Sequence, residues 1–234
     1  ILLDRSLSAS SRMLEFVFRM MAEGDVAIPA AGIGAIPEQM AGRLPAGTVR
    51  PGARVASASP REVRLESGET VGGDAVVIAT EGPEAARLAS LPAPGSRPVT
   101  CLYFAAERAP IDGPLLVLDG DESGPVNNLC VPSRVAPTYA PAGAALVSMS
   151  VVGGAAADAG PDALEAAVRK QMEGWFGSEA RDWRHLRTYR IHHAQPEQRP
   201  GTLEPVERPV RLEGGLFVCG DHRDTASIQG ALFS

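Results

Sequence analysis

One segment near the end of the sequence, residues 214–234, constrains the fold of the chain more than any other. It contains an apolar run, Leu216–Cys219, which leads directly into Gly220 and Asp221. A short apolar run bounded by glycines is typical of a buried strand, and the residues Ser227–Ser234 after the next loop favour a helix. The segment is therefore predicted to form a strand, a turn and a helix in succession.

A strand, turn and helix of this kind suit the binding of an adenine dinucleotide or a flavin. Gly220 allows close approach of the backbone to a ligand, and the Asp221 carboxylate can accept hydrogen bonds from sugar or ribityl hydroxyl groups. The N–H groups at residues 227–230 can face an electron-rich oxygen. A capped helix after a surface aspartate explains the same pattern, so spacing alone leaves both interpretations open.

Residues 48–80 are predicted to form a small β meander followed by one further strand. Short β-prone runs separated by turn-forming residues lie at 49–58, 62–65 and 70–71. The continuous apolar run Ala75–Ala79 is typical of a fully buried strand in a parallel sheet. Because open α/β sheets bind ligands at the carboxyl ends of such strands, Thr80 is a candidate ligand-binding position.

The remaining chain is predicted to form helices around a mainly antiparallel sheet. Extended segments are expected at 99–105, 114–119, 126–131, 144–152 and 183–192. Helices are expected at 83–91 and 162–176, and another includes Met13–Met21. The Met and Phe stripe of that last helix is expected to pack in the core.

A turn at Gly32–Gly34 contains two glycines and precedes a helix that begins near Pro37. A dinucleotide-binding loop needs a preceding strand and a third glycine, and Pro37 stands in the place of that glycine. We therefore predict a tight turn that lets a helix pack closely, rather than a pyrophosphate-binding loop.

Charge and composition exclude several classes of partner. The net charge is −6 and Lys170 is the only lysine among 22 basic residues, so no nucleic-acid partner is predicted. No apolar run has the length of a transmembrane segment and no signal-peptide pattern is present, so a cytoplasmic location is expected. The three cysteines are expected to be buried free thiols. His192–His193 lacks further ligands at metal spacing, so no metal site is predicted.

The sequence of residues 214–234 resembles the C-terminal FAD motif of the flavin amine oxidase superfamily, which includes phytoene desaturases and protoporphyrinogen oxidases. The resemblance implies that Gly220 and Asp221 contact the sugar-phosphate part of the cofactor. It also implies that the start of the last helix approaches the pyrimidine edge of the flavin. The implied contacts there are Ser227, Ile228, Gln229 and Ala231.

The resemblance continues through the rest of the chain. Pro29–Leu44 is similar to the family's glycine turn and helix, the backbone of Val55 is implied to meet adenine, and Thr80 is implied to lie near the cofactor. The implied fold is α/β, with a partial FAD-binding domain interleaved with an antiparallel-sheet substrate domain. The expected boundaries are a substrate-domain helix segment at 1–31, FAD-domain meander and strand at 32–82, substrate domain at 83–209, and C-terminal FAD-domain strand and helix at 210–234.

The family's N-terminal strand, Gly-rich loop and acidic ribose ligand have no counterpart in this sequence. We therefore expect the chain to be the C-terminal portion of a longer protein, with the missing dinucleotide-binding segment either elsewhere in that protein or on a second chain. FAD is expected in the complete protein, and tight binding by this portion alone is not expected. The implied reaction passes a hydride equivalent from an apolar or amine small molecule to flavin, with His222 and Arg223 as candidates for tuning it. The alternative is a noncatalytic module that retains the fold and binds a ligand or protein without flavin.

Overall fold

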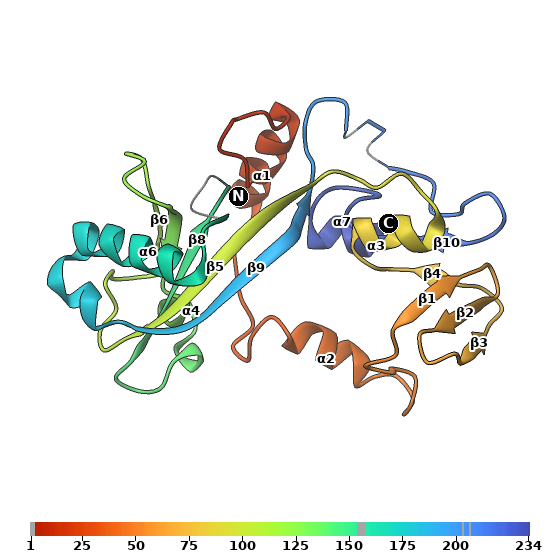
Figure 1. Cartoon of the computed structure of the whole chain (residues 1–234), viewed down its shortest axis with the longest axis horizontal. Coiled ribbons are helices and arrows are strands. Elements are labelled where there is room, and N and C mark those ends of the chain that lie inside the picture. Colours follow the sequence, from red (N-terminus) through yellow and green to blue (C-terminus); the bar gives the residue numbers. More distant parts are fainter. Residues whose placement is uncertain (1–2, 154–157, 203, 206) are drawn as a thin grey trace.

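The computed structural model describes residues 3–153, 158–202, 204–205 and 207–234. Its largest sheet has five antiparallel strands in the order β6-β7-β8-β5-β9. These strands are β5 (Ser96–Ala106), β6 (Leu116–Leu118), β7 (Val126–Cys130), β8 (Ala145–Val151) and β9 (Arg184–Pro196). The long strands β5 and β9 run side by side from this sheet toward the smaller part of the molecule (Figure 1).

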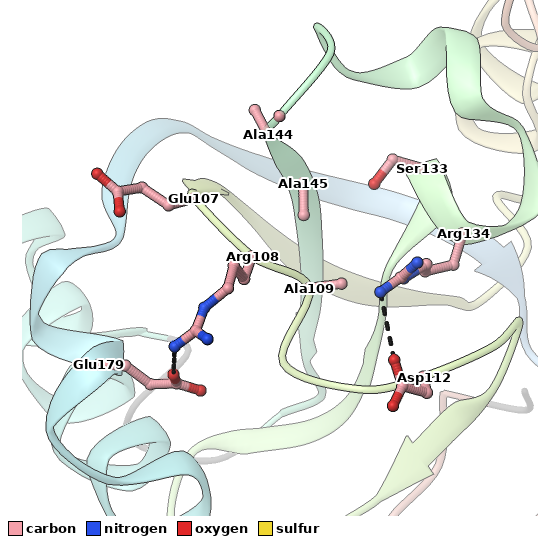
Figure 2. A pocket seen from close by; sticks show the side chains of 10 residues that line it. Glu107, Arg108, Ala109, Asp112, Ser133, Arg134, Ala144, Ala145 and Glu179 are labelled. Atoms are coloured by element: carbon pink, nitrogen blue, oxygen red, sulfur yellow. Dashed lines mark hydrogen bonds and ion pairs between the residues drawn. The ribbon is translucent and has the colours of Figure 1, made fainter.

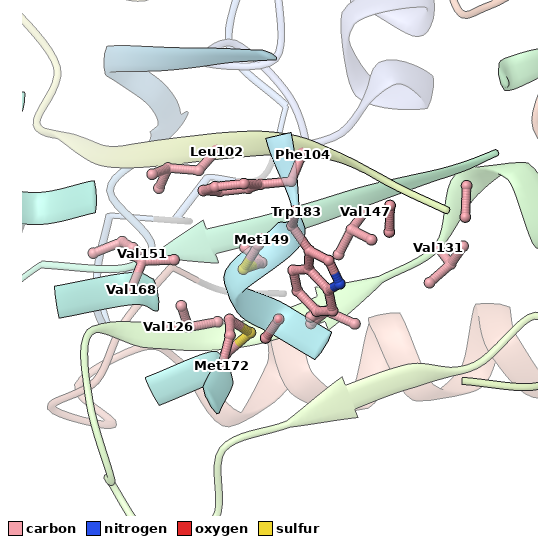
Figure 3. Packing of buried hydrophobic residues seen from close by; sticks show 14 of the residues in the cluster. Leu102, Phe104, Val126, Val131, Val147, Met149, Val151, Val168, Met172 and Trp183 are labelled. Carbon is pink, nitrogen blue, oxygen red and sulfur yellow. The ribbon is translucent and has the colours of Figure 1, made fainter. Parts of the chain in front are cut away.

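Alternation along the strands gives the large sheet one packed face. On β5, Leu102 and Phe104 are buried whereas Cys101 and Tyr103 between them are only half-buried. The helix α6 (Pro161–Phe176) and the short 3-10 helix η2 (Gly177–Asp182) add apolar side chains to the same cluster (Figure 3). Each fully buried large apolar side chain contributes about 1.5–3 kcal/mol, so this cluster is a substantial source of stability.

The smaller part of the molecule contains two further sheets. The strands β1 (Val55–Ala58), β2 (Glu62–Leu65) and β3 (Thr70–Gly72) form an antiparallel meander. The strands β4 (Val77–Ile78) and β10 (Phe217–Val218) pair in parallel, and Ile78 and Val218 pack with the helix α3 (Gly82–Ala89) in a small apolar cluster. Residues from distant parts of the sequence therefore build one sheet.

The other helical elements are α1 (Ser11–Glu23), α2 (Ala35–Ala41), α4 (Pro132–Val135), the 3-10 helix η1 (Pro137–Tyr139) and α7 (Ile228–Phe233). The chain before α1 is tied to the end of β9, because the Ser10 N–H donates to the Gln198 carbonyl at 2.7 Å. The Tyr139 hydroxyl donates to the Pro29 carbonyl at 3.0 Å and so anchors the segment between α1 and α2. Among the described helices, none has the length and apolarity needed to cross a bilayer.

The predicted α/β class, with helices and antiparallel sheets, is confirmed.

The expectation that Ala75–Ala79 is a fully buried strand is wrong. β4 contains two residues, and the Val77 side chain is 57% exposed. Among the described residues β4 has one neighbouring strand, β10, and the Val77 side chain lies outside the apolar cluster that buries Ile78. The domain boundaries stay a prediction.

The apolar stripe of α1 also differs from expectation. The helix forms as predicted between Ser10 and Gly24, but Met13 is its one buried residue, and Leu14 and Phe18 are exposed. No described element packs over that side of the helix. The three cysteines are free thiols, as predicted, but each is half-buried rather than buried.

Candidate functional site

The parallel pair β4 and β10 brings two predicted ligand-binding positions together. The Cys219 N–H donates to the Ile78 carbonyl at 3.0 Å, so both strands end at the same level. Thr80 follows β4 and Gly220 follows β10, and a Cβ added at Gly220 would lie 3.4 Å from the Thr80 carbonyl oxygen. The two positions therefore meet at the carboxyl edge of the parallel pair, where α/β sheets bind ligands.

Gly220 is required at this edge by its backbone and its surroundings. Its φ of +141° lies in a region that other residues rarely adopt, and an added Cβ would lie 2.7 Å from the His222 ring. Its N–H donates to the Ser234 hydroxyl at 2.8 Å, which ties the end of β10 to the end of α7. The glycine thus fixes the turn, and its N–H is already bonded within the chain.

Asp221 places an open acceptor beside this turn. Its side chain is one-third exposed, and its nearest described polar partner is the His222 Nδ1 atom at 3.8 Å, beyond hydrogen-bonding distance. No described donor bonds the carboxylate, so its oxygens can accept hydrogen bonds from hydroxyl groups of a ligand.

His222 is buried at the same turn, with 6% of its side chain exposed. Both ring nitrogens lack a hydrogen-bond partner among the described residues. The ring packs against the backbone of Gly82 at the start of α3, where an added Cβ would come within 3.3 Å of it. An imidazole buried in this way has donor or acceptor capacity that a ligand can use.

Arg208 and Arg223 bind the loop through backbone carbonyls. The Arg208 guanidinium donates to the carbonyls of His222 and Thr202 at 2.9 and 2.7 Å. The Arg223 guanidinium donates to the Pro209 carbonyl, and its buried Nε lacks a described partner. Burial, followed by the charge of Arg208, lowers the pKa of Arg223 below its usual value. Sequence reasoning missed Arg208, because it lies in an irregular Pro-rich segment with no periodic signal.

The start of α7 has two free donors. The Ser227 hydroxyl caps the helix by accepting from the Gly230 N–H at 3.0 Å, and the Ala231 N–H donates to the Ser227 carbonyl. The N–H groups of Ile228 and Gln229 have no described partner, as is usual in the first turn of a helix. Of the predicted contacts on this helix, these two therefore retain free backbone donors.

Val55 lies on β1, the first strand of the meander. Its carbonyl accepts from the Arg87 guanidinium of α3 at 2.9 Å, so α3 links the meander to the rest of the smaller unit. No described hydrogen bond joins Val55 to Gly220 or Asp221. The structure thus brings Thr80, Gly220 and Asp221 into one site and places Val55 on a separate strand.

A hollow of about 190 Å³ lies against the same turn. Its wall includes Asp221, His222 and Arg208, together with Glu197 and Thr202 from the segment after β9. The hollow therefore combines an open carboxylate with buried, unpartnered ring nitrogens, which is the polar environment expected at a ligand site.

A second hollow, of about 540 Å³, differs in character (Figure 2). Four of its five charged side chains form two ion pairs: Arg108 lies 3.4 Å from Glu179, and Arg134 lies 3.3 Å from Asp112. None of the described buried, unpartnered polar atoms belongs to it. Exposed pairs of this kind contribute little and point to a solvated surface, so we assign the candidate site to the Gly220 turn.

Known proteins resemble the chain at the level of family and fold. The model of the family of flavin-containing amine oxidoreductases matches residues 1–234. A search among curated proteins gave no match.

Solved structures share the fold of the chain at low sequence identity. An Exiguobacterium sp. 255-15 protein to which protoporphyrinogen oxidase activity is attributed has a TM-score of 0.68 at 15% identity, covering 88% of this chain and 49% of that one. Reduced UDP-galactopyranose mutase has a TM-score of 0.64 at 13% identity, covering 82% and 46%. Wild-type putrescine oxidase bound to putrescine has a TM-score of 0.62 at 13% identity, covering 87% and 51%. The chain spans about half the length of these proteins.

Proposed function

Because the chain belongs to the family of flavin-containing amine oxidoreductases, we propose that it forms part of an FAD-dependent oxidoreductase that transfers a hydride equivalent from an amine or apolar small molecule to flavin. The observation that carries the proposal is the Gly220 turn. There the carboxyl ends of a parallel strand pair meet an open carboxylate and a helix start with free N–H groups. FAD, when bound, supplies the hydride acceptor, and the chain supplies binding and orientation.

The residues at the turn fit such a cofactor in different ways. Asp221 would accept hydrogen bonds from sugar or ribityl hydroxyls, since its carboxylate has no described hydrogen bond within the chain. The Ile228 and Gln229 N–H groups would donate to electron-rich oxygens of the cofactor. Gly220 and Thr80 would allow its close approach to the backbone, with Ser227 and Ala231 maintaining the helix start.

His222 and Arg223 are proposed to tune the cofactor rather than to act as a dedicated base. Support comes from the ring nitrogens of His222 and the Nε of Arg223, which are buried without a described partner at the turn. A histidine here can donate to charge that develops during the reaction. Arg208 would act as a positioning residue, because it bonds the carbonyl of His222.

We further propose that a dinucleotide-binding segment completes the site, either elsewhere in the same protein or on a second chain. The proposed contact of the Val55 backbone with adenine belongs to that completed site. A cytoplasmic location is also proposed, and the three free thiols fit a reducing compartment.

The absorbance spectrum of the complete protein, isolated under native conditions, tests the proposal. We expect flavin bands in the visible range and release of FAD on denaturation. The Gly220→Ala variant should lose most of its flavin, because the added Cβ meets His222 at 2.7 Å. Gly120→Ala is the matched control, since nothing lies within 4 Å of a Cβ there.

A colourless protein that takes up no added FAD would overturn the oxidoreductase proposal. A noncatalytic binding module that keeps the fold would then be the better account. Equal flavin content in the Gly220→Ala and Gly120→Ala variants would leave a flavoprotein whose cofactor lies elsewhere.

A further inference from the structure

Among the described residues, the side chains on the face of the large sheet opposite its packed core are half-buried or exposed. On β5, Cys101 and Tyr103 point away from the core residues Leu102 and Phe104. On β9, the register places Tyr189 opposite Cys101. The side chains of this face thus form a surface of aromatic, aliphatic and small polar groups rather than a second apolar core.

A hollow of about 520 Å³ lies on this face, and one of its seven lining side chains carries a charge. The hollow is lined by Cys101, Tyr103, Leu146, Leu186, Arg187, Tyr189 and Ile191. Burial raises the pKa of the Cys101 thiol and that of the Tyr103 hydroxyl, so both stay neutral near pH 7. Arg187 is therefore the charged group of the hollow.

The guanidinium of Arg187 is oriented but has no anionic partner. It lies over the ring of Tyr189, with 5.0 Å between the guanidinium carbon and the ring centroid. Tyr189 in turn packs edge-on against Tyr103, at 5.8 Å between ring centroids. No described carboxylate lies within ion-pair distance of Arg187. Stacking over one face of a guanidinium leaves its N–H edge available, and that edge matches a planar carboxylate.

The other arginines that line hollows differ from Arg187 in this respect. In the charged hollow of Figure 2, Arg108 and Arg134 each have a carboxylate partner. At the Gly220 turn, Arg208 donates to backbone carbonyls. The Arg187 hollow thus joins a guanidinium that has no described hydrogen-bond or ion-pair partner to an apolar wall, formed by Leu186, Tyr189 and Ile191.

We propose that this hollow binds an apolar carboxylic acid, with the Arg187 guanidinium paired to the carboxylate and the hydrocarbon part packed against the apolar wall. That this acid is the substrate rests on the proposed oxidoreductase function and selects its apolar rather than its amine alternative; the binding of the acid does not rest on that function. Charge complementarity selects this occupant. A purely apolar ligand would leave Arg187 unpaired, and a cationic amine would be repelled by it.

Isothermal titration of the isolated protein with decanoate tests the proposal without requiring flavin. Decanoate is expected to bind at least about tenfold more tightly than decyltrimethylammonium, which has the same chain and the opposite charge. Acetate, which has the carboxylate alone, should bind too weakly to detect. Arg187→Met should weaken decanoate binding about tenfold or more, and Arg187→Lys should restore part of the loss because it restores the charge.

Arg64→Met is the matched control, because it removes one exposed positive charge from β2 in the smaller unit. It should leave decanoate binding unchanged. Failure of decanoate to bind, equal binding of the two decyl compounds, or equal affinities of wild type and Arg187→Met would each overturn the proposal. Decanoate binding by a protein that never takes up FAD would uphold the site and reject the oxidoreductase function instead.

Discussion

The large five-stranded sheet and the small parallel pair β4–β10 differ in how completely this chain builds them. The large sheet has a continuous packed face in which Phe104 is 1% exposed. The parallel pair has two residues in each strand and an exposed Val77, and in the turn after it the buried ring nitrogens of His222 have no hydrogen-bond partner among the described residues. The large sheet is therefore stabilised by its own packed core. The small unit instead leaves polar groups and strand surface available to a ligand or to another protein segment.

The largest expected effect separates the two regions directly. Phe104→Ala should lower the free energy of unfolding by about 3–5 kcal/mol, because it leaves a cavity in the packed face. Val77→Ala should change it by about 0.5 kcal/mol or less, since the side chain is already exposed in the folded chain. Urea denaturation measures both values. Similar losses for the two variants would mean that the small unit is packed as tightly as the large one.

A smaller effect is expected at the start of α7. Ser227→Ala removes the hydroxyl that accepts from the Gly230 N–H, and loss of such a cap costs about 0.5–2 kcal/mol. Amide hydrogen exchange in this variant should be faster than in the wild type only at residues 228–233.

The matched control for this cap is Ser178→Ala, since Ser178 is exposed and has no described side-chain hydrogen bond. It should leave exchange unchanged throughout. Faster exchange across the large sheet in Ser227→Ala would show that the two regions unfold as one unit and would contradict their separate stabilities.

The smallest expected effect concerns the thiols of the large sheet. Burial raises the pKa of both Cys101 and Cys130. In the pH range between their unfolded and folded pKa values, the folded chain binds more protons, so stability should fall as pH rises through that range. Alkylation by iodoacetamide at pH 8.5 should be slower in the folded protein than in urea. Equal rates would show that these thiols are not shielded.

The large sheet was predictable because its pattern is local. Alternating burial along β5 and β8 follows from strand geometry, and the predicted segments at 99–105 and 144–152 correspond closely to them. β9 extends beyond the predicted His192 to Pro196, because β5 begins at Ser96 and pairs with that residue. Such an extension depends on pairing with a partner strand, so the local sequence pattern of the segment does not predict it.

The candidate site was predictable in its chemistry but not in its packing. The glycine and aspartate after an apolar run indicated Gly220 and Asp221, and the structure places Thr80 beside them. The burial of His222 was not predictable, because it depends on Gly82 and Pro94 from a distant segment. The prediction that the apolar stripe of α1 packs in the core was wrong for a related reason. Helical periodicity shows that one face of the helix is apolar, but not whether another element of this chain packs against that face.

The affinity of the flavin-depleted complete protein for FAD tests the central claim most directly. Asp221→Asn should weaken FAD binding about tenfold, because a charged acceptor is replaced by a neutral amide at the turn. Asp112→Asn removes an equal charge at the exposed hollow of Figure 2 and should leave the affinity unchanged. Equal FAD affinities for the wild type and the Asp221→Asn variant would contradict the assignment of the cofactor site to the Gly220 turn.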